Sequence, residues 1–518
     1  MKRYFLLFVT ILLLSTVSVE AQRYSYTQIH KMPKSIERDY YIWRYLNQKS
    51  CTKKEALSII KDVSYISYKI KKAYKKKTGK SIAKKRKVHK PISKKAKKLL
   101  KAKQKHAKSI IRSKTPFKLW LKESSKNKIF VFNNSGKSGR KLLNHKLPKK
   151  IWQELTTHAS FNRSISLIKK ENLKYLAKSF LYKITKNNRL SYDNLFYLGF
   201  NALNHGYNSV ATKYFSYAIP KGRHREDMDR AIFWKYMANK SKSGLRDLVK
   251  SYDINIYTLL ARDILKLKYP TTITPTLPKA KLVSSRYIKS PIYWTKLRRE
   301  IRRSRGDKSA LAKLAKKYES YESIGYYTYI KAKASREKDQ YFPMPYRDLI
   351  HKLPKSRQAI LYAIARQESR FIPGAISSSY ALGMMQIMPF LVDDLAKKRK
   401  EHIDYDDMFD PRTSIKYANE HMNYLTKWLH HPLFIAYAYN AGIGYTRRML
   451  RTPKMFRSSK GHEPYYSLEV LGNSQARRYG KHVMANYVIY MNKLGVNLRV
   501  TDLIKTLHIP SRTDKFRK

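Results

Sequence analysis

The spacing of apolar residues is the feature that most limits what this chain can fold into. From Ile151 to about Pro270, and again from about residue 346 onward, apolar residues recur every three to four positions, as amphipathic helices require. No long stretch alternates between apolar and polar residues, as a half-buried strand would. We therefore expect an all-α protein, with an N-terminal α-solenoid-like helical region followed by a C-terminal helical domain.

One segment has the spacing of a tetratricopeptide-type helical hairpin. Small residues in such a hairpin let two helices approach closely, and large residues fill the seam between them. A second copy begins at Trp234 but matches only in its opening, so we expect a solenoid-like array and not a strict repeat protein. The residues at the expected offsets are Leu195, Leu198, Gly199, Ala202, Ala211, Phe215 and Ala218.

Changes in composition divide the rest of the chain. Lysine dominates one segment in which large apolar residues are sparse, so no packed core is expected there. The expected parts are a signal peptide at 1–21, a short helical segment at 22–67, a Lys-rich low-complexity segment at 68–125, an α-helical superstructure domain at 126–335 and a catalytic domain at 346–518.

The charge of the chain narrows its partners. Lys and Arg number 111 against 35 Asp and Glu, a formal net charge of +76. Such an excess favours a polyanionic partner: nucleic acid, anionic lipid headgroups or acidic cell-wall polymers. The sequence leaves two interpretations of the Lys-rich segment open, a solvated tether or a patch that binds an anionic cell-envelope surface.

Residues 1–21 have the outline of a secretory signal peptide. A basic start at Lys2 is followed by an apolar run from Tyr4 to Val19 and by a small-x-small ending at Ala21. The apolar run is shorter than the ~20 residues that span a bilayer, so cleavage is favoured over an uncleaved anchor. We expect export to the periplasm, which argues against a nucleic-acid partner.

Glu368 is the candidate catalytic residue. It lies near the end of an apolar helix, four residues after Ile364, where apolar neighbours raise the pKa of a carboxyl. A carboxyl that keeps its proton at neutral pH suits general acid catalysis. From spacing alone, a helix-end glutamate paired with Arg366 or Arg370 is the simpler interpretation, so the surroundings have to decide.

Groups that bind sugars follow Glu368 in the sequence. Ser377 to Ser379 supply hydroxyls, Gly383 permits close backbone approach, and Gln386 offers an amide that donates and accepts. Tyr439 adds an aromatic ring near a helix end. This mixture of hydroxyl, amide and ring favours a glycan-binding cleft.

Together these motifs resemble the catalytic domain of the soluble lytic transglycosylases, a family that cleaves the glycan strands of peptidoglycan. The resemblance is specific over about 346–495 and looser over 151–335, where larger members carry a ring-shaped helical superstructure. It implies a lysozyme-like helical catalytic domain. The matching motifs are Glu368-Ser369, Ser377, Gly383-Met384-Met385-Gln386-Ile387-Met388-Pro389, Ala438-Tyr439-Asn440-Ala441-Gly442, and Glu469 with Arg477, Tyr479 and Lys481.

The resemblance also implies roles for residues of this chain. Glu368 corresponds to the single catalytic acid. The chain departs from the family at Tyr380, where glycine is usual, and at Leu382 and Met384, which bears on the width of the cleft. The residues that correspond to glycan-positioning residues are Ser377, Gln386, Met388, Tyr439 and Glu469.

The implied reaction needs one carboxyl and neither metal nor cofactor. Protonated Glu368 donates to the oxygen that links N-acetylmuramic acid to N-acetylglucosamine. The ionised carboxylate then removes the proton of the 6-hydroxyl of the same muramic residue, and this hydroxyl closes to a 1,6-anhydro end, outside the usual two-carboxylate scheme. A hydrolase would instead favour a second carboxylate; Asp393 and Asp394 lie nearby but suit surface or capping positions better.

Other functions stay open. A lysozyme-like hydrolase of the same bond and a non-catalytic cell-wall-binding scaffold are the alternatives; a nucleic-acid-binding protein is disfavoured by the signal peptide. No zinc site is expected, because the spacing of the histidines fits no ligand pattern. The expected partners are peptidoglycan glycan strands and an anionic cell-envelope surface, with neither nucleic acid nor metal. These histidines, all in the C-terminal part of the chain, are His402, His421, His430 and His431.

Overall fold

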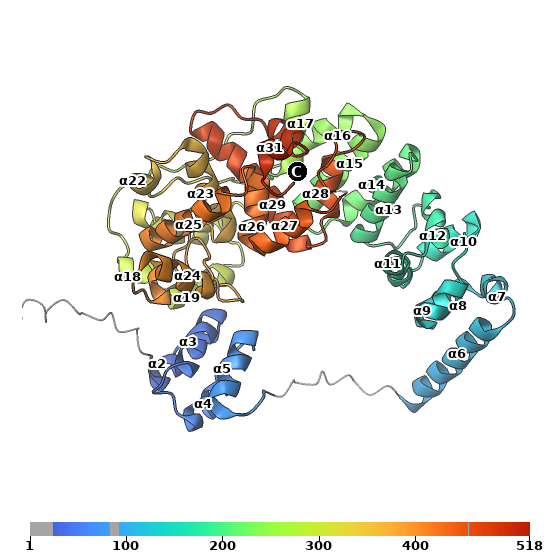
Figure 1. Cartoon of the computed structure of the whole chain (residues 1–518), viewed down its shortest axis with the longest axis horizontal. Coiled ribbons are helices and arrows are strands. Elements are labelled where there is room, and N and C mark those ends of the chain that lie inside the picture. The colour runs from blue at the N-terminus through green and yellow to red at the C-terminus, as the bar shows by residue number, and fades with distance from the viewer. Residues whose placement is uncertain (1–23, 83–92, 454, 518) are drawn as a thin grey trace, which may run out of the picture. The chain divides into compact units, whose positions relative to one another are not determined.

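The computed structural model of the protein describes residues 24–82, 93–453 and 455–517 (Figure 1). Within these ranges the regular structure is helical, and strand pairing is limited to isolated bridges, which confirms the all-α expectation. The expected signal peptide, residues 1–21, lies outside the described residues. None of the helices in the described ranges combines the length and the apolar character that crossing a bilayer requires.

The chain divides into two compact units. The first unit combines the described residues of two separate stretches, Met1–Lys84 and Tyr269–Lys518, and the second is formed by those of Lys85–Lys268. The sequence instead placed the residues up to 335 in the helical superstructure. The difference arises because the helices between residues 285 and 334 pack with the C-terminal part, a long-range preference that composition does not record.

The second unit is a succession of short helices. Neighbours in the chain pack against each other, as in a solenoid: α13 on α14, α14 on α15, α15 on α16 and α16 on α17. Its helices are α6 (Lys94–Arg112), α7 (Pro116–Lys122), α8 (Ser125–Asn134), α9 (Gly136–Leu142), α10 (Lys149–Thr156), α11 (Phe161–Glu171), α12 (Lys174–Ala177), α13 (Tyr192–Asn204), α14 (Asn208–Ala218), α15 (Arg225–Asn239), α16 (Lys242–Val249) and α17 (Ile256–Ile264).

The expected helical hairpin is α13 with α14. The two helices come so close at Gly199 that an added Cβ would lie 2.7 Å from Cε1 of Phe215. Phe215 is itself fully buried. A small residue facing a large one therefore sets the close approach, as the spacing predicted.

The first unit is built around α29. This helix packs against both α23 and α26, and every residue from Val483 to Met491 is buried. The helices of this unit are α2 (Tyr26–His30), α3 (Ile36–Leu46), α4 (Lys53–Ile59), α5 (Tyr68–Thr78), α18 (Ser285–Ile288), α19 (Pro291–Arg303), α20 (Lys308–Lys316), α21 (Ile324–Ala334), α22 (Arg347–Ile350), α23 (Lys355–Glu368), α24 (Pro389–Arg399), α25 (Pro411–Thr426), α26 (Pro432–Ala441), α27 (Ile443–Leu450), α28 (Tyr465–Val470), α29 (Ser474–Lys493), α30 (Val500–Thr506) and α31 (Pro510–Thr513).

Local signals fix several helix ends. The Thr52 side chain accepts from the Glu55 amide while the Glu55 side chain accepts from the Thr52 amide, a complete capping box at the start of α4. At the start of α25 the Asp410 side chain accepts from the amides of Arg412 and Thr413, and Pro411 takes the first helical position. Both caps satisfy backbone amides that a helix start leaves without intrahelical partners.

The Lys-rich segment is less uniform than its composition indicated. Helix α5 buries Ile70, Ala73 and Tyr74 and packs on α3 and α4. These three residues recur at helical spacing, which lysines between them conceal. By contrast, every residue of α6 from Lys94 to His106 is exposed. These residues therefore lack a packed core, as the composition predicted.

Candidate active site

Glu368 is the last residue of α23. Apolar residues of this helix from Ala359 to Ala365 are buried, and the helix packs along α29. The helix ends here because Arg370 and Phe371 both adopt positive φ, at 55° and 65°, which α-helix geometry excludes. The end of a buried helix therefore carries a half-buried carboxyl.

The surroundings of Glu368 set its protonation. Burial raises the pKa of Glu368 to about 7, and a hydrogen bond from Tyr479, whose hydroxyl donates to Oε1 at 2.7 Å, opposes this rise. Arg370 pairs with Glu337 at 2.7 Å, and Arg366 donates to the Tyr341 carbonyl at 2.8 Å. The raised pKa and these contacts therefore argue against the alternative that a neighbouring arginine keeps Glu368 charged.

The turn at Gly383 lies against the end of α23. The Ser369 hydroxyl donates to the Met384 carbonyl at 2.7 Å, and the Tyr439 hydroxyl donates to the Met385 carbonyl at 2.8 Å. Burial and, to a smaller extent, the charge of Glu368 raise the pKa of the Tyr439 phenol well above its ordinary value. The structure thus brings together Glu368, the turn and Tyr439, which the sequence spreads over 72 positions.

Gln386 holds the same turn from inside. It adopts a φ of 53°, and its amide nitrogen donates to the carbonyls of Gly383 at 2.8 Å and Ala375 at 3.1 Å. The side chain is half-buried. The Gln386 side-chain nitrogen therefore stabilises the turn. The predicted contact with the glycan would be made by the side-chain oxygen.

The other predicted glycan-positioning residues lie in different settings. The Ser377 hydroxyl accepts from the amides of Ser379 and Ala381 and so holds its own loop. Met388 is half-buried at the start of α24. Glu469 is buried in an ion pair with Lys481, 3.1 Å apart, both side chains at most 5% exposed. Their roles toward a glycan stay predictions.

Tyr479 has no predicted role but contacts the predicted acid. It was part of the resemblance to the family, yet only the packing of α29 on α23 shows that its hydroxyl reaches Glu368, 111 positions away in the chain. Burial and the charge of Glu368 raise the pKa of Tyr479 well above its ordinary value, so it stays protonated as a donor at neutral pH.

We expect Tyr479→Phe to move the pH profile of this site. The lost hydrogen bond stabilises the charged form of Glu368, so its pKa of about 7 should rise. An activity that needs the protonated carboxyl falls as pH rises through that pKa, and the variant should keep its activity to a higher pH. The measurement is kcat/KM between pH 5 and 9; an unmoved or acid-shifted alkaline limb would contradict the assignment.

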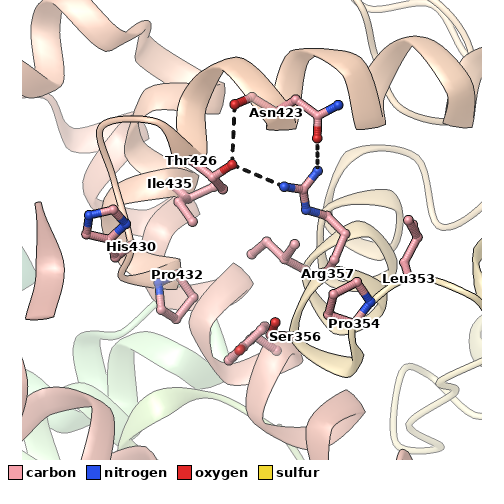
Figure 2. Close-up of a pocket in the computed structure, with 11 residues that line it drawn as sticks. Leu353, Pro354, Ser356, Arg357, Asn423, Thr426, His430, Pro432 and Ile435 are labelled. Carbon is pink, nitrogen blue, oxygen red and sulfur yellow. Dashed lines mark hydrogen bonds between the residues drawn. The ribbon is translucent and has the colours of Figure 1, made fainter.

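A pocket at the other end of α23 holds none of the predicted site residues (Figure 2). Its wall includes Arg357, which donates to Asn423 at 2.7 Å and to Thr426 at 3.1 Å. Arg357 precedes Glu368 by eleven residues, roughly 16 Å along a helix. This pocket therefore lies away from the predicted acid, at the opposite end of the helix.

No metal centre is seen in the described ranges: no group of three or more His, Cys, Asp or Glu residues is arranged to hold an ion. Of the four histidines His402, His421, His430 and His431, His421 lies near Tyr439, with ring centroids 5.6 Å apart. Burial lowers the pKa of His421 to about 4, so its ring is neutral at neutral pH.

Residues 350–460 match the family model described as the Transglycosylase SLT domain. This range contains Glu368, the Gly383 turn and Tyr439. The chain therefore carries a transglycosylase SLT domain. The carboxyl at the end of α23, the turn and the Tyr439 helix are parts of that domain, as the resemblance implied.

Curated relatives also match part of this chain. The soluble lytic murein transglycosylases of Salmonella typhimurium and of Escherichia coli K12 are 28% and 29% identical over 163 residues, 30% of this chain and 24% of each relative. A putative soluble lytic murein transglycosylase of Haemophilus influenzae is 39% identical over 82 residues, 15% of this chain and 14% of the relative. The chain thus spans about a quarter of the length of the first two relatives.

Solved structures were also found to be similar. An inactive mutant of the lytic transglycosylase Slt of Pseudomonas aeruginosa has a TM-score of 0.45 at 14% identity, covering 90% of this chain and 83% of that chain. The 70 kDa soluble lytic transglycosylase of Escherichia coli has a TM-score of 0.40 at 15% identity, covering 93% and 92%.

Proposed function

We propose that this protein cleaves the bond between N-acetylmuramic acid and N-acetylglucosamine in peptidoglycan without water and leaves 1,6-anhydromuramic ends. The observation that carries the proposal is Glu368 itself. Its carboxyl is half-buried and lies in the SLT domain. The pKa of Glu368, about 7, lets this carboxyl give up and take back one proton near neutral pH.

Each step of the reaction uses that one carboxyl. Protonated Glu368 donates to the glycosidic oxygen as the bond breaks. The resulting carboxylate then accepts the proton of the 6-hydroxyl, which closes on the anomeric carbon. General acid and base catalysis is most effective when the pKa lies near the working pH. The Tyr479 hydroxyl on Oε1 orients the carboxyl, and Oε2 is then the atom that meets the substrate.

A hydrolytic route would favour a second carboxylate that holds water. Asp393 accepts from the Tyr405 hydroxyl at 2.9 Å, and Asp394 pairs with Lys398 on the surface of α24. Among the described residues, the causes of the Glu368 pKa shift are burial and the Tyr479 hydroxyl, and neither is a carboxylate. These positions support the non-hydrolytic route over the lysozyme-like alternative.

Product analysis tests the proposal. Purified sacculi are digested with the protein, and the released fragments are weighed by mass spectrometry. An anhydro end is lighter than a reducing end by one water, so the expected products carry that deficit. Fragments with reducing ends would replace the transglycosylase by a hydrolase.

We further propose that the protein acts in the periplasm and contacts an anionic cell-envelope surface through α6. This helix holds eight lysines, one arginine and no acidic residue. Lysines at helical spacing line one face, and their mutual repulsion destabilises the free helix. An anionic surface would relieve that repulsion.

Removing charge from α6 should weaken binding to anionic surfaces. We expect replacement of Lys97, Lys101, Lys105 and Lys108 by glutamine to lower binding at least 100-fold, because each lysine near such a surface contributes about 1 kcal/mol. Co-sedimentation with sacculi and with phosphatidylglycerol vesicles measures this.

The matched control removes the same four charges from another exposed part of the second unit, at Lys174, Lys178, Lys183 and Lys186. It should bind almost as well as the wild type. Equal losses in the two variants would mean that net charge, and not α6, governs binding.

A further inference from the structure

Tyr380 has a backbone conformation that does not suit its side chain. Its φ is 62°, in the left-handed region that glycine enters freely and bulky residues rarely do. Glycine is the residue that the related family usually has at this position. Nevertheless the tyrosine side chain is only 1% exposed. Something in this chain therefore compensates for a strained residue.

The compensation comes from the N-terminal segment, residues 24–82. The Tyr380 hydroxyl donates to the Asp39 carbonyl and accepts from the Ser67 hydroxyl, each at 3.2 Å. The Tyr380 ring lies 5.8 Å from the ring of Tyr40 and 5.6 Å from that of Trp43. The side chain thus inserts into the bundle of α3 and α5.

Arg44 forms a second anchor between the same segment and the SLT domain. Its guanidinium binds both oxygens of Asp404, at 2.6 and 2.9 Å, and also reaches Asp406 at 3.2 Å. The Tyr40 hydroxyl donates to Asp406 at 2.6 Å. The Arg44 and Asp404 side chains are 10% and 9% exposed, so bidentate geometry and burial make this a strong anchor.

Both anchors connect to the loop of the candidate site. Tyr380 lies between Ser377 and Gln386 in the sequence, and its amide donates to the Ser377 carbonyl at 2.9 Å. The strained residue is therefore part of the loop. Asp406 belongs to the short helix Tyr405–Phe409, and the Met408 carbonyl of that helix lies against Gly383. The N-terminal segment therefore holds the loop on one side and the support of its turn on the other.

We propose that residues 24–82 are a working part of the catalytic unit and that Tyr380 is the positioning residue through which they hold the Ser377–Gln386 loop ready for a glycan. The inference rests on the proposed function, since it assigns the loop to glycan binding. It concerns substrate affinity; the proton transfer stays with Glu368.

Two variants of Tyr380 test this. Tyr380→Gly relieves the backbone strain but removes the anchor, and we expect KM for glycan strands to rise about tenfold while kcat changes less than threefold. Tyr380→Phe keeps the ring contacts and should restore most of the affinity. The pH profile of kcat should be the same in both variants, because it reports Glu368.

Tyr68→Ala is the matched control. Tyr68 lies on α5 of the same segment and is 79% exposed, so its removal should leave KM unchanged. Arg44→Gln weakens the second anchor and leaves the amino acids of the loop unchanged, and it should also raise KM. This variant keeps the inference testable if Tyr380→Gly does not fold.

Hydrogen exchange of the α3 amides provides the second readout. Exchange should be at least tenfold faster in Tyr380→Gly than in wild type or Tyr68→Ala. Faster exchange in Tyr380→Gly and Arg44→Gln with unchanged KM would overturn the inference. If the wild type releases no anhydro product, the proposed function fails, and the affinity for glycan strands is then measured in place of KM. A tenfold loss of that affinity in Tyr380→Gly supports the inference. An unchanged affinity overturns it.

Discussion

Replacing Glu368 with glutamine is expected to lower kcat for release of anhydro fragments from sacculi by about a thousandfold or more. General acid and general base catalysis each contribute roughly 10²- to 10⁴-fold, and here one carboxyl performs both. The amide keeps the size of the side chain and the hydrogen bond from Tyr479, so folding and binding should persist. Mass spectrometry of released fragments is the measurement.

Asp394→Asn is the matched control for that experiment. Asp394 lies in the same domain, in an ion pair with Lys398 whose side chains are more than half exposed, and such pairs contribute little to stability. Activity should be unchanged. Undiminished activity of Glu368→Gln would remove the proposed mechanism, and sacculus binding without cleavage by the wild type would leave a cell-wall-binding scaffold.

Replacing Gly383 with alanine is expected to be the most destabilising small change in the site. A Cβ at this position would lie 1.9 Å from the Met408 carbonyl oxygen, and the φ of 73° is one that alanine rarely adopts. Backbone cannot move as a flexible side chain would, so we expect a loss of about 3 kcal/mol or more in the free energy of unfolding.

Thermal unfolding measures the effect, as a fall in Tm of roughly 6 °C or more. Gly444→Ala is the control, because its φ is not positive and the nearest atom to an added Cβ is the end of the Arg448 side chain at 3.6 Å. That variant should differ from wild type by less than about 0.5 kcal/mol. Equal Tm values for the two variants would contradict the role of Gly383.

Local signals were sufficient to predict much of the fold. Helical periodicity gave the all-α class, and the caps at Thr52 and Asp410 are visible in the sequence because they involve residues within three positions. Glu368 could be chosen because the apolar stripe of α23 leads to it. Such signals depend on neighbours in the chain.

The remainder depends on contacts between distant parts of the chain. Tyr479 reaches Glu368 only because α29 packs on α23, and Glu469 was predicted at the glycan without any sign that Lys481 would bury it in an ion pair. Tyr380 stood out only as a departure from the family. Its partners Asp39 and Ser67 are more than 300 positions away, beyond the reach of any local pattern.

The ion pair of Arg44 with Asp404 has a consequence for the order of folding. Its members are 360 positions apart, and the whole second unit, Lys85–Lys268, lies between them in the chain. Contacts of such long range form slowly because the intervening loop must first close. The helices synthesised earliest are thus expected to dock last, after the solenoid and the SLT domain are complete.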